Sequence, residues 1–337
     1  MLLTARKHVQ EALRRPWFRA RKPLAKSAIS EPCLKAADAD LLGRFREIVS
    51  DPINILIERV PRAGMVEDGL VWLHNGNRVP VVGRNAYYGQ FSDVLVINRG
   101  VHEPLEEYVF QETLRVMPDE PLMLELGAYW GHYSMWMKRQ RPRSQVFMVE
   151  PEARHLRAGR DNFKRHGYDG TFIRALVSSG HFEVDRFMSE RSFPRLSVLH
   201  SDIQGFEVDM LNGAAESFAR GLIDYTFVST HSQGLHEAVL TKLSEAGMRI
   251  EVSSGFDFET TSCDGFIFAS RTALPPVFPA FNPVGRIDIM ECSCAELVSY
   301  LASRLPFDNA TATKSGPAPL ATRPVSTVEA SRVEKLR

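Results

Sequence analysis

Histidines and carboxylates follow two apolar runs in the second half of the chain, where they could take up and hold a proton. His200 and Asp202 are two residues apart in the run LSVLHSD, so on an extended strand their side chains share one face. His231 ends the next apolar run, and His236 lies just beyond it. Because an imidazole titrates near neutral pH, we expect His231 to be a general base and Asp202 to orient it or the substrate. His200 and His236 are the further catalytic candidates.

Each of these residues also has a structural interpretation. His200 fits a hydrogen-bonded core histidine, His236 a surface residue on a helix, and Asp264 a turn residue before Gly265. A divalent metal held by histidine and carboxylate at adjacent strand ends is the competing chemistry. No residues here have the spacing of a dedicated metal motif, so the sequence predicts chemistry without a metal.

A glycine-containing turn precedes these residues in the stretch MLELGAYWGHYS. An apolar run ends in Glu125, the chain turns through Gly127 and Gly131, and a helical pattern begins, which is typical of a buried parallel strand leading into a helix. Gly127 allows a tight turn, and Gly131 allows a ligand or the strand to approach the helix closely. The spacing is G-x-x-x-G behind an acid and not G-x-G-x-x-G. It therefore favours S-adenosylmethionine over a diphosphate cofactor such as NAD.

A second acid completes the expected cofactor site. Glu150 ends the run QVFMVE, and a carboxylate at this position can accept both ribose hydroxyl groups. The alternative is that Glu150 caps the next helix, with Pro151 in its first turn. Tyr129 and Trp130 could face the sulfonium in a cation–π contact or pack under a lid. The expected cofactor contacts are Glu125, Gly127, Tyr129, Trp130, Gly131, Ser134, Glu150 and Asp202.

Three segments together resemble the FkbM-type family of S-adenosylmethionine-dependent methyltransferases. They are ELGAYWGHYS, VEP and DIQGFE, in that order, and the fourth strand of the family characteristically ends D-x-Q-G-x-E. A branch of the family is also similar at GVHEPLEEYVF, STHSQGLH and SCDGFIFAS, so the resemblance covers roughly residues 60 to 271. Much of the family has a small residue and Asn where this chain has Tyr129 and Trp130. The methionine end of the cofactor must therefore be held differently.

The resemblance implies a class I methyltransferase fold with the last strand inserted antiparallel. It also implies O-methylation of a hydroxyl group on a glycan, a sugar-containing compound or a secondary metabolite. One rival is a dehydrogenase of similar topology, which the missing G-x-G-x-x-G disfavours. A second rival is a catalytically silent binding protein on the same scaffold, which the intact motifs disfavour. The expected partner is a small-molecule or glycan substrate, and the sequence indicates no oligomeric state.

Apolar runs alternate with helical patterns through the rest of the chain. This order predicts an α/β fold with a doubly wound, mostly parallel, seven-stranded, Rossmann-like sheet. We expect its strands near 121–127, 145–150, 170–177, 196–202, 224–230, 249–254 and 265–271. One helix is expected to carry Val208, Leu211, Ala215 and Phe218 and to end at Gly221. Another is expected to carry Leu235, Val239, Leu243 and Ala246, and a further helix is expected at 292–304.

The part of the chain before this sheet is expected to be a substrate-facing subdomain. We expect a helix near 36–50, a hairpin around Asn75-Gly76-Asn77 and a helix at 103–116 with Pro104 in its first turn. The predicted organisation is a basic arm at 1–35, a helical and hairpin subdomain at 36–118 and a methyltransferase domain at 119–306. A tail rich in Ala, Thr, Pro and Ser at 307–337 is expected to be disordered.

Composition limits the classes of partner. The 337 residues are 44% apolar, with 41 basic and 41 acidic residues, so no global basic field exists to hold a nucleic acid. The four cysteines lack C-x-x-C spacing and are expected to be ordinary thiols; they are Cys33, Cys263, Cys292 and Cys294. The chain has neither a bilayer-spanning apolar run nor a secretory leader pattern, which predicts a cytoplasmic protein.

The basic arm has two interpretations. Leu13, Trp17 and Phe18 lie among several arginines, an arrangement that could make weak contact with an anionic membrane surface. A solvated arm or a helix docked on the catalytic domain is the favoured interpretation.

Overall fold

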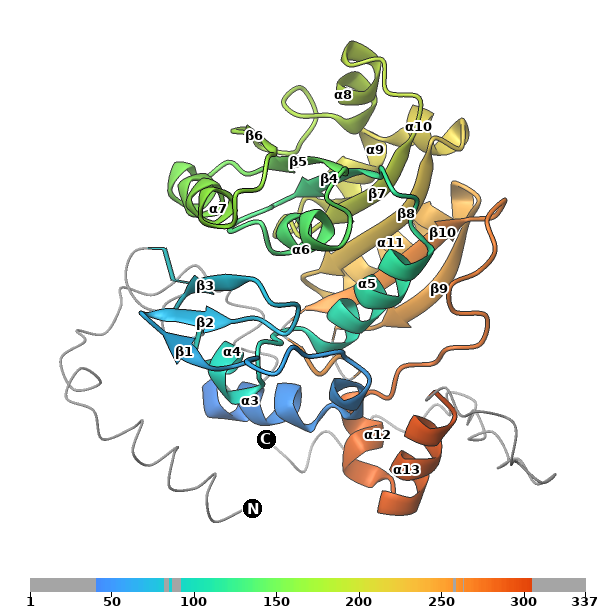
Figure 1. Cartoon of the computed structure of the whole chain (residues 1–337). Coiled ribbons are helices and arrows are strands. Elements are labelled where there is room, and N and C mark those ends of the chain that lie inside the picture. Colours follow the sequence, from blue (N-terminus) through green and yellow to red (C-terminus); the bar gives the residue numbers. More distant parts are fainter. Residues whose placement is uncertain (1–40, 82–84, 87–91, 257–258, 263, 305–337) are drawn as a thin grey trace.

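The computed structural model describes residues 41–81, 85–86, 92–256, 259–262 and 264–304, shown in colour in Figure 1. The predictions for the basic arm at 1–35, for the tail at 307–337 and for Cys33 and Cys263 lie outside these residues. The described part contains a three-stranded sheet near its N-terminal end and a seven-stranded sheet that forms the centre of the molecule.

The seven-stranded sheet has the predicted topology. Its strands, in spatial order, are β6 (Thr171–Ile173), β5 (Gln145–Val149), β4 (Leu122–Leu126), β7 (Leu196–Ser201), β8 (Ile223–Thr230), β10 (Gly265–Arg271) and β9 (Met248–Ser254). The first five are parallel, and β10 is antiparallel to both β8 and β9. This is the strand order of the class I methyltransferase sheet, so the expected fold class and the inserted last strand are confirmed.

One strand is shorter than expected. β6 ends at Ile173, although the apolar pattern predicted a strand over 170–177. Val177 instead forms an isolated bridge with Phe182. The chain therefore leaves the edge of the sheet early and turns toward the next helix.

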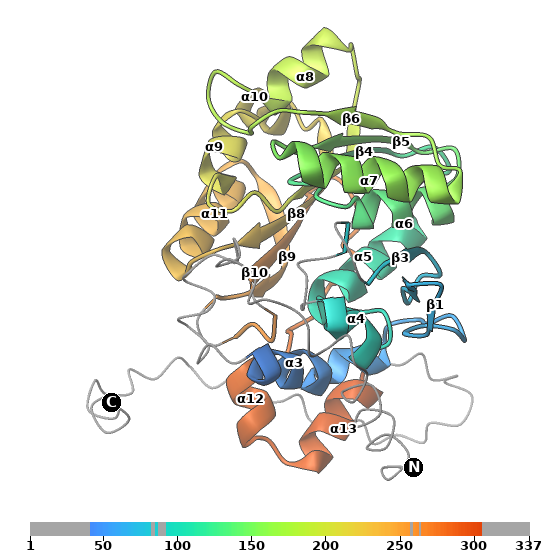
Figure 2. The same ribbon diagram turned by 90° about the vertical axis from the view of Figure 1, so that its left-hand side faces the viewer.

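Helices cover the two faces of this sheet (Figures 1 and 2), and an apolar layer lies on each face. One layer contains α8 (Val184–Glu190), α9 (Glu207–Asn212), α10 (Ala215–Ala219) and α11 (Gln233–Glu245). The other contains α5 (Pro104–Val116), α6 (His132–Gln140) and α7 (Ala153–His166). Neighbouring residues of β4 show the alternation, because Leu124 packs in the first layer and Met123 in the second. Both faces of the strands are thus buried, as their continuous apolar runs predicted.

The single helix expected over Val208 to Phe218 is wrong, because the structure has two helices there. α9 ends at Asn212 and α10 begins at Ala215. The Asp185 carboxylate accepts hydrogen bonds from the backbone N–H groups of Glu216 and Ser217 at 2.8 and 2.7 Å. A distant side chain therefore caps a new helix start, which local apolar spacing cannot reveal.

The chain before the seven-stranded sheet contains the expected helix, described from Leu41 onward, and the expected hairpin. Its elements are α3 (Leu41–Ser50), η2 (Pro52–Ile55), β1 (Val66–Glu67), β2 (Leu70–Trp72), β3 (Arg78–Pro80) and α4 (Asp93–Ile97). The Leu73 N–H donates to the Asn77 carbonyl at 2.8 Å and closes the predicted turn. β1 was not expected and pairs with the outer side of β2.

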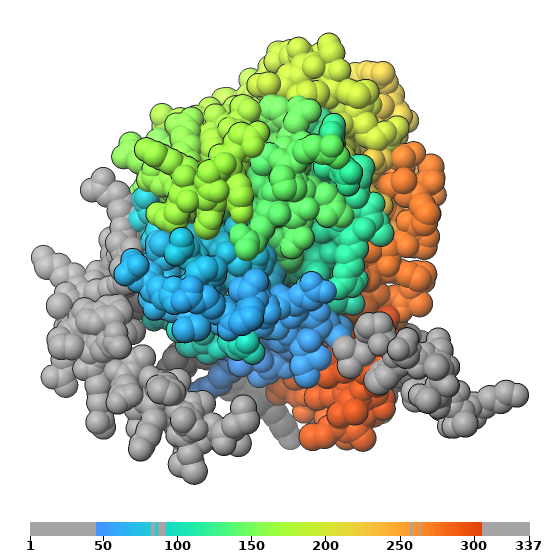
Figure 3. All heavy atoms as spheres, viewed as in Figure 1, coloured from blue at the N-terminus to red at the C-terminus, as the bar shows by residue number. Residues whose placement is uncertain are grey.

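The hairpin region packs against the segment around α7, and in Figure 3 the blue atoms lie directly against the green ones. The Tyr168 hydroxyl donates to the Asn77 side-chain oxygen at 2.8 Å. The Arg78 N–H donates to Nε2 of His166 at 3.1 Å. The hairpin turn is therefore fixed to the end of α7.

Two short helices follow the last strand, and Figures 1 and 2 show both beside α3. α13 (Cys294–Ala302) lies within the helix expected at 292–304, whereas α12 (Arg286–Glu291) was not expected. Cys292 and Cys294 are free thiols. In the residues that the structure describes, every helix is too short or too polar to cross a membrane.

Candidate active site at the strand ends

Gly127 joins the turn after β4 to the segment after β7. It has φ of +73°, and a Cβ atom on it would lie 1.7 Å from the backbone oxygen of Asp202. Only a residue without a side chain fits between these two segments. The turn glycine therefore fixes the distance between the expected cofactor turn and the residues that follow β7.

Glu125 holds the start of α6. Its two carboxylate oxygens accept hydrogen bonds from the backbone N–H groups of Tyr133 and Ser134 at 3.3 and 3.0 Å. Burial raises the pKa of this carboxyl group, while His200 and the Ser134 and Tyr133 contacts act in the opposite direction. The structure thus gives Glu125 and the Ser134 backbone a role in shaping the turn.

Glu150 lies at the end of β5 and binds both neighbouring turns. One oxygen accepts the Tyr129 N–H at 3.1 Å, and the other accepts the Glu152 N–H at 2.8 Å. Pro151 is not in the helix that follows, because Glu152 is the N-cap of α7. The Glu150 carboxylate therefore holds the glycine turn in place, and it has acceptor sites beyond these two bonds.

The remaining residues of the turn pack on different neighbours. A Cβ atom on Gly131 would lie 3.1 Å from the Phe163 ring, so this glycine makes room for α7. The Tyr129 ring meets the His155 ring edge-on at 4.1 Å, beside Glu150. Trp130 is buried, and its ring centroid is 5.1 Å from that of His132. Trp130 is therefore part of the packed interior next to the turn.

His231 follows β8 and lies between acids on both sides of its ring. Its Nδ1 atom is 2.7 Å from an oxygen of Glu207, which is fully buried in the first turn of α9. Its Nε2 atom is 3.1 Å from Asp202 and 3.6 Å from Asp264. The Gln204 amide bonds to both Asp202 and this Nε2 atom. The imidazole is therefore oriented by a buried carboxylate and presents its second nitrogen to the strand ends.

The surrounding charges set the protonation of this group. Burial opposes the imidazolium, but Asp264, Asp202 and Glu207 together hold the pKa of His231 well above its usual value. Burial likewise opposes the Asp202 carboxylate, and its hydrogen bond with His231 makes the pKa of Asp202 lower than usual. Asp202, His231 and Asp264 offer three ligand atoms within 4.8 Å of one another. The geometry is thus compatible with a proton-accepting group and with the competing metal interpretation.

His200 lies apart from His231 and faces α5. Its Nε2 atom is 2.6 Å from Glu106 in α5, and the Ser229 hydroxyl donates to the other oxygen of Glu106 at 2.8 Å. The ring also contacts the Tyr133 ring in a tilted arrangement with centroids 4.2 Å apart. His200 is buried and links α5 to β7 and β8, which matches the interpretation as a core histidine.

His236 has hydroxyl partners on both ring nitrogens. Nδ1 is 2.9 Å from the Thr230 hydroxyl, and Nε2 is 2.9 Å from the Ser253 hydroxyl. Burial lowers the pKa of its imidazolium. The interpretation of His236 as a surface residue is wrong, because its side chain is buried and bonded to residues of β8 and β9. It is bound to different residues from those that surround His231.

Three side chains that contact the candidate histidines were not predicted as site residues from the sequence. Glu207 and Gln204 both belong to the DIQGFE segment, so the motif itself carried the signal that they accompany Asp202. Glu106 lies in the first turn of α5 and is buried. A glutamate is rarely buried unless it has a partner. The pairing of Glu106 with His200 spans 94 positions and could be seen only in the fold.

Comparisons with known proteins find only distant structural similarity. No protein-family model matches the chain, and no curated protein sequence matches it. A precorrin-6y C5,15-methyltransferase from Geobacter metallireducens has a TM-score of 0.37 and 15% identity, covering 49% of this chain and 86% of that one. Methyltransferase FkbM from Methylobacillus flagellatus has a TM-score of 0.37 and 15% identity, covering 54% of this chain and 53% of that one. Aeropyrum pernix fibrillarin with bound S-adenosyl-L-methionine has a TM-score of 0.34 and 17% identity, covering 45% and 68%.

Proposed function

We propose that this protein is an S-adenosylmethionine-dependent methyltransferase that transfers a methyl group to a hydroxyl oxygen. One observation carries the proposal. His231, held by the buried Glu207, presents its Nε2 atom beside Asp202, and the Asp202 backbone is in contact with Gly127 of the cofactor turn. A proton-accepting group is thereby fixed against the turn that would hold the methyl donor.

The turn residues fit this cofactor. Glu150 accepts backbone N–H groups from both sides of the turn and retains acceptor sites for ribose hydroxyl groups. Glu125 and the start of α6 shape the end of the turn where the amino acid part would lie. Gly127, Tyr129, Gly131 and Ser134 would contact the cofactor through the same turn, and Trp130 would support it from below. S-adenosylmethionine supplies an electrophilic methyl group on a sulfonium centre.

We call Asp202, His231 and Asp264, which lie together at the strand ends, the rim. Each of them has a task in the proposed reaction. Methyl transfer to a hydroxyl requires in-line alignment of the two partners and removal of the hydroxyl proton. His231 in its neutral form accepts that proton at Nε2, and Glu207 holds the ring by its Nδ1 atom. Asp202 and Asp264 stabilise the imidazolium that results. Both aspartates are suited to accept hydrogen bonds from the acceptor molecule.

The charges at the rim favour a neutral, hydroxyl-rich acceptor. Glu103 is surrounded by acids, and burial together with Glu106, Asp202 and Asp264 raises its pKa well above the usual value. An anionic acceptor would be repelled from such a cluster, whereas hydroxyl groups find carboxylate acceptors there. A glycan, another sugar-containing compound or a hydroxylated secondary metabolite is the substrate class that this chemistry suits.

Ligand binding and turnover test the proposal together. Thermal-shift titrations with S-adenosylmethionine, S-adenosylhomocysteine and NAD should show stabilisation by the first two alone. Incubation with candidate glycans and metabolites should then give a methyl mass gain by mass spectrometry. Stabilisation by NAD would support the dehydrogenase, and binding without turnover across the hydroxylated acceptors would support the silent scaffold.

The metal interpretation of the rim makes a different prediction. If Asp202, His231 and Asp264 held a required divalent ion, EDTA would inactivate the protein and Mg²⁺ or Mn²⁺ would restore activity. Full turnover in EDTA together with an impaired His231→Ala variant supports the metal-free base.

A further inference from the structure

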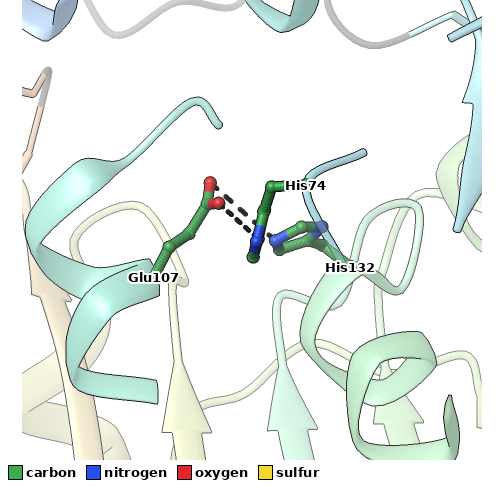
Figure 4. A group of neighbouring side chains, drawn as sticks. All are labelled: His74, Glu107 and His132. Carbon is green, nitrogen blue, oxygen red and sulfur yellow. Dashed lines mark ion pairs between the residues drawn. The ribbon is translucent and has the colours of Figure 1, made fainter. Parts of the chain in front are cut away.

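A second cluster of histidines lies inside the molecule, away from the rim. His74 follows β2 in the hairpin turn, Glu107 lies in the first turn of α5, and His132 is the first residue of α6. Figure 4 shows the three side chains converging from these separate segments. All three are buried, and their ligand atoms lie within 4.8 Å of one another. This arrangement joins the N-terminal subdomain to the helix that begins at the glycine turn.

The distances within the cluster suit a bound ion. Nε2 of His74 is 2.7 Å from one oxygen of Glu107, and Nε2 of His132 is 3.9 Å from the other. Ligand atoms around a tetrahedral zinc ion, each about 2.0–2.1 Å from the metal, lie about 3.3 Å apart. The two observed separations lie on either side of that value. Small side-chain shifts would therefore bring the three groups around one ion.

His132 gives an independent indication of a ligand. Its side chain is 3% exposed, and neither ring nitrogen has a hydrogen-bond partner. Leaving a buried polar group without a partner costs about 1–3 kcal/mol. A metal ion bound to one ring nitrogen would supply a partner that the described residues do not provide.

Residues next to the cluster hold the His74 ring and the Glu107 carboxylate in position, as is usual for the ligands of a metal site. Nδ1 of His74 lies 3.3 Å from the Glu58 carbonyl oxygen, so a proton on Nδ1 leaves the Nε2 lone pair directed at Glu107. Nδ1 of His102 lies 2.6 Å from an oxygen of Glu107 and positions that carboxylate. Histidine ligands whose second nitrogen meets a carbonyl, and ligating carboxylates with their own hydrogen bonds, are typical of metal centres.

An ion pair network without a metal explains less of this geometry. In such a network His74 and His102 would be the partners of Glu107, at 2.7 and 2.6 Å from its two oxygens. Such a network leaves both nitrogens of His132 without partners. A cation between His74, His132 and Glu107 provides a partner for one of them.

A route to the cluster is present. A hollow of about 490 Å³ is lined by His74, Asn75 and Trp136 and also by Glu58 and Arg115. The side chains of Glu58 and Arg115 are 74% and 53% exposed, so the hollow opens to solvent. The hollow therefore extends from solvent to the segment that carries His74.

We propose that His74, Glu107 and His132 bind one divalent transition metal ion of the zinc class, with His102 positioning Glu107. Two imidazoles and one carboxylate form a nitrogen-rich donor set that suits zinc and its neighbours better than Mg²⁺ or Ca²⁺. The ion links the hairpin, α5 and the first residue of α6. It therefore fixes the start of α6 directly behind the glycine turn.

The test measures uptake by the full-length chain. Protein stripped with a chelator and dialysed is titrated with Zn²⁺ against a chromophoric competitor, and with Co²⁺ followed by visible absorption. We expect one tight site per chain, a higher melting temperature with Zn²⁺ and no effect of Mg²⁺. His132→Gln should abolish this site. His102→Gln, which changes an outer partner, should weaken it by about 10–100-fold.

Matched variants separate this site from the rim. Asp264→Asn removes a candidate ligand at the rim, and His166→Gln removes a half-buried imidazole outside the cluster; both should keep the site. No Zn²⁺ or Co²⁺ uptake by the wild-type chain would overturn the proposal. So would uptake that survives His132→Gln and is lost in Asp264→Asn.

X-ray absorption of the zinc-loaded wild type covers the case in which the variants do not fold. The buried cluster requires two imidazole ligands and one carboxylate, whereas the rim offers one imidazole and two carboxylates. A zinc shell with two imidazoles supports the proposal, and a shell with one imidazole or none overturns it.

Discussion

An oxygen of Glu207 lies 2.7 Å from Nδ1 of His231, and Glu207 is fully buried. This contact fixes which ring nitrogen carries a proton toward the interior, so the other nitrogen faces Asp202 and Asp264. The proposed base is therefore oriented from α9, while its chemistry takes place at the ends of β7 and β8.

Loss of the proposed base should affect turnover and not cofactor binding. His231→Ala should lower turnover by about 10²–10⁴-fold, the usual contribution of general base catalysis, with nearly unchanged affinity for S-adenosylhomocysteine. His181→Ala is the matched control, because His181 is exposed and distant in the chain. A fully active His231→Ala variant would shift the assignment to His200, His236 or Asp202.

The pH dependence of turnover should reflect the raised pKa of His231. A base acts when it has lost its proton, so activity should increase with pH through that pKa, above the value of about 6.5 for a free imidazole. Asp264 is the largest contribution that raises this pKa. In Asp264→Asn the acid limb of kcat/KM should therefore move to lower pH. An unmoved limb would indicate that another group controls the rate.

The raised pKa of His231 should also make the stability of the fold depend on pH. A group whose pKa is raised in the folded protein stabilises the fold at low pH, and that contribution disappears as pH rises through the folded-state pKa. The stabilising effect of the His231 ion pairs should thus be complete below about pH 6.5 and decline at higher pH. Melting temperatures of wild type and His231→Ala should therefore converge as the pH is raised.

The sheet could be predicted from the sequence because its signals are local. β4 and β7 are largely apolar, fully buried strands followed by glycine turns, and both were expected within one residue of their observed ends. The length of β6 was overestimated because the apolar Val177 was counted as part of the strand. In the structure Val177 pairs only with Phe182, outside the sheet. The break between α9 and α10 depends on Asp185, which a local pattern does not include.

The side-chain clusters could be predicted only in part. Asp202 and His231 were expected together because parallel strands end at one edge of a sheet. His74 and His132 are 58 positions apart, and neither lies in a metal motif, so nothing in their spacing connects them. Their meeting depends on how the hairpin packs against α6, which is a property of the fold.

The acid at the end of β5 should contribute to cofactor affinity. Glu150→Gln keeps the size of the side chain but removes the charge and one acceptor group, so affinity for S-adenosylhomocysteine should fall by about 1.5–3 kcal/mol. Glu152→Gln is the matched control, because Glu152 caps α7 from the surface two residues away. Calorimetry on folded variants decides the matter. Equal affinities for the two variants would remove the ribose role of Glu150.

Gly127 should tolerate no side chain, and Gly180 provides the matched control. Both have positive φ, +73° and +77°, so alanine at either position loses about 1–2 kcal/mol through backbone strain. A Cβ atom on Gly180 meets nothing within 4 Å, whereas on Gly127 it would overlap the Asp202 backbone. Gly127→Ala should therefore lower the free energy of unfolding well beyond the loss in Gly180→Ala, and it should abolish binding of S-adenosylhomocysteine. Equal losses in urea denaturation would show that the two segments can separate, and the proposed coupling between the cofactor turn and Asp202 would then be wrong.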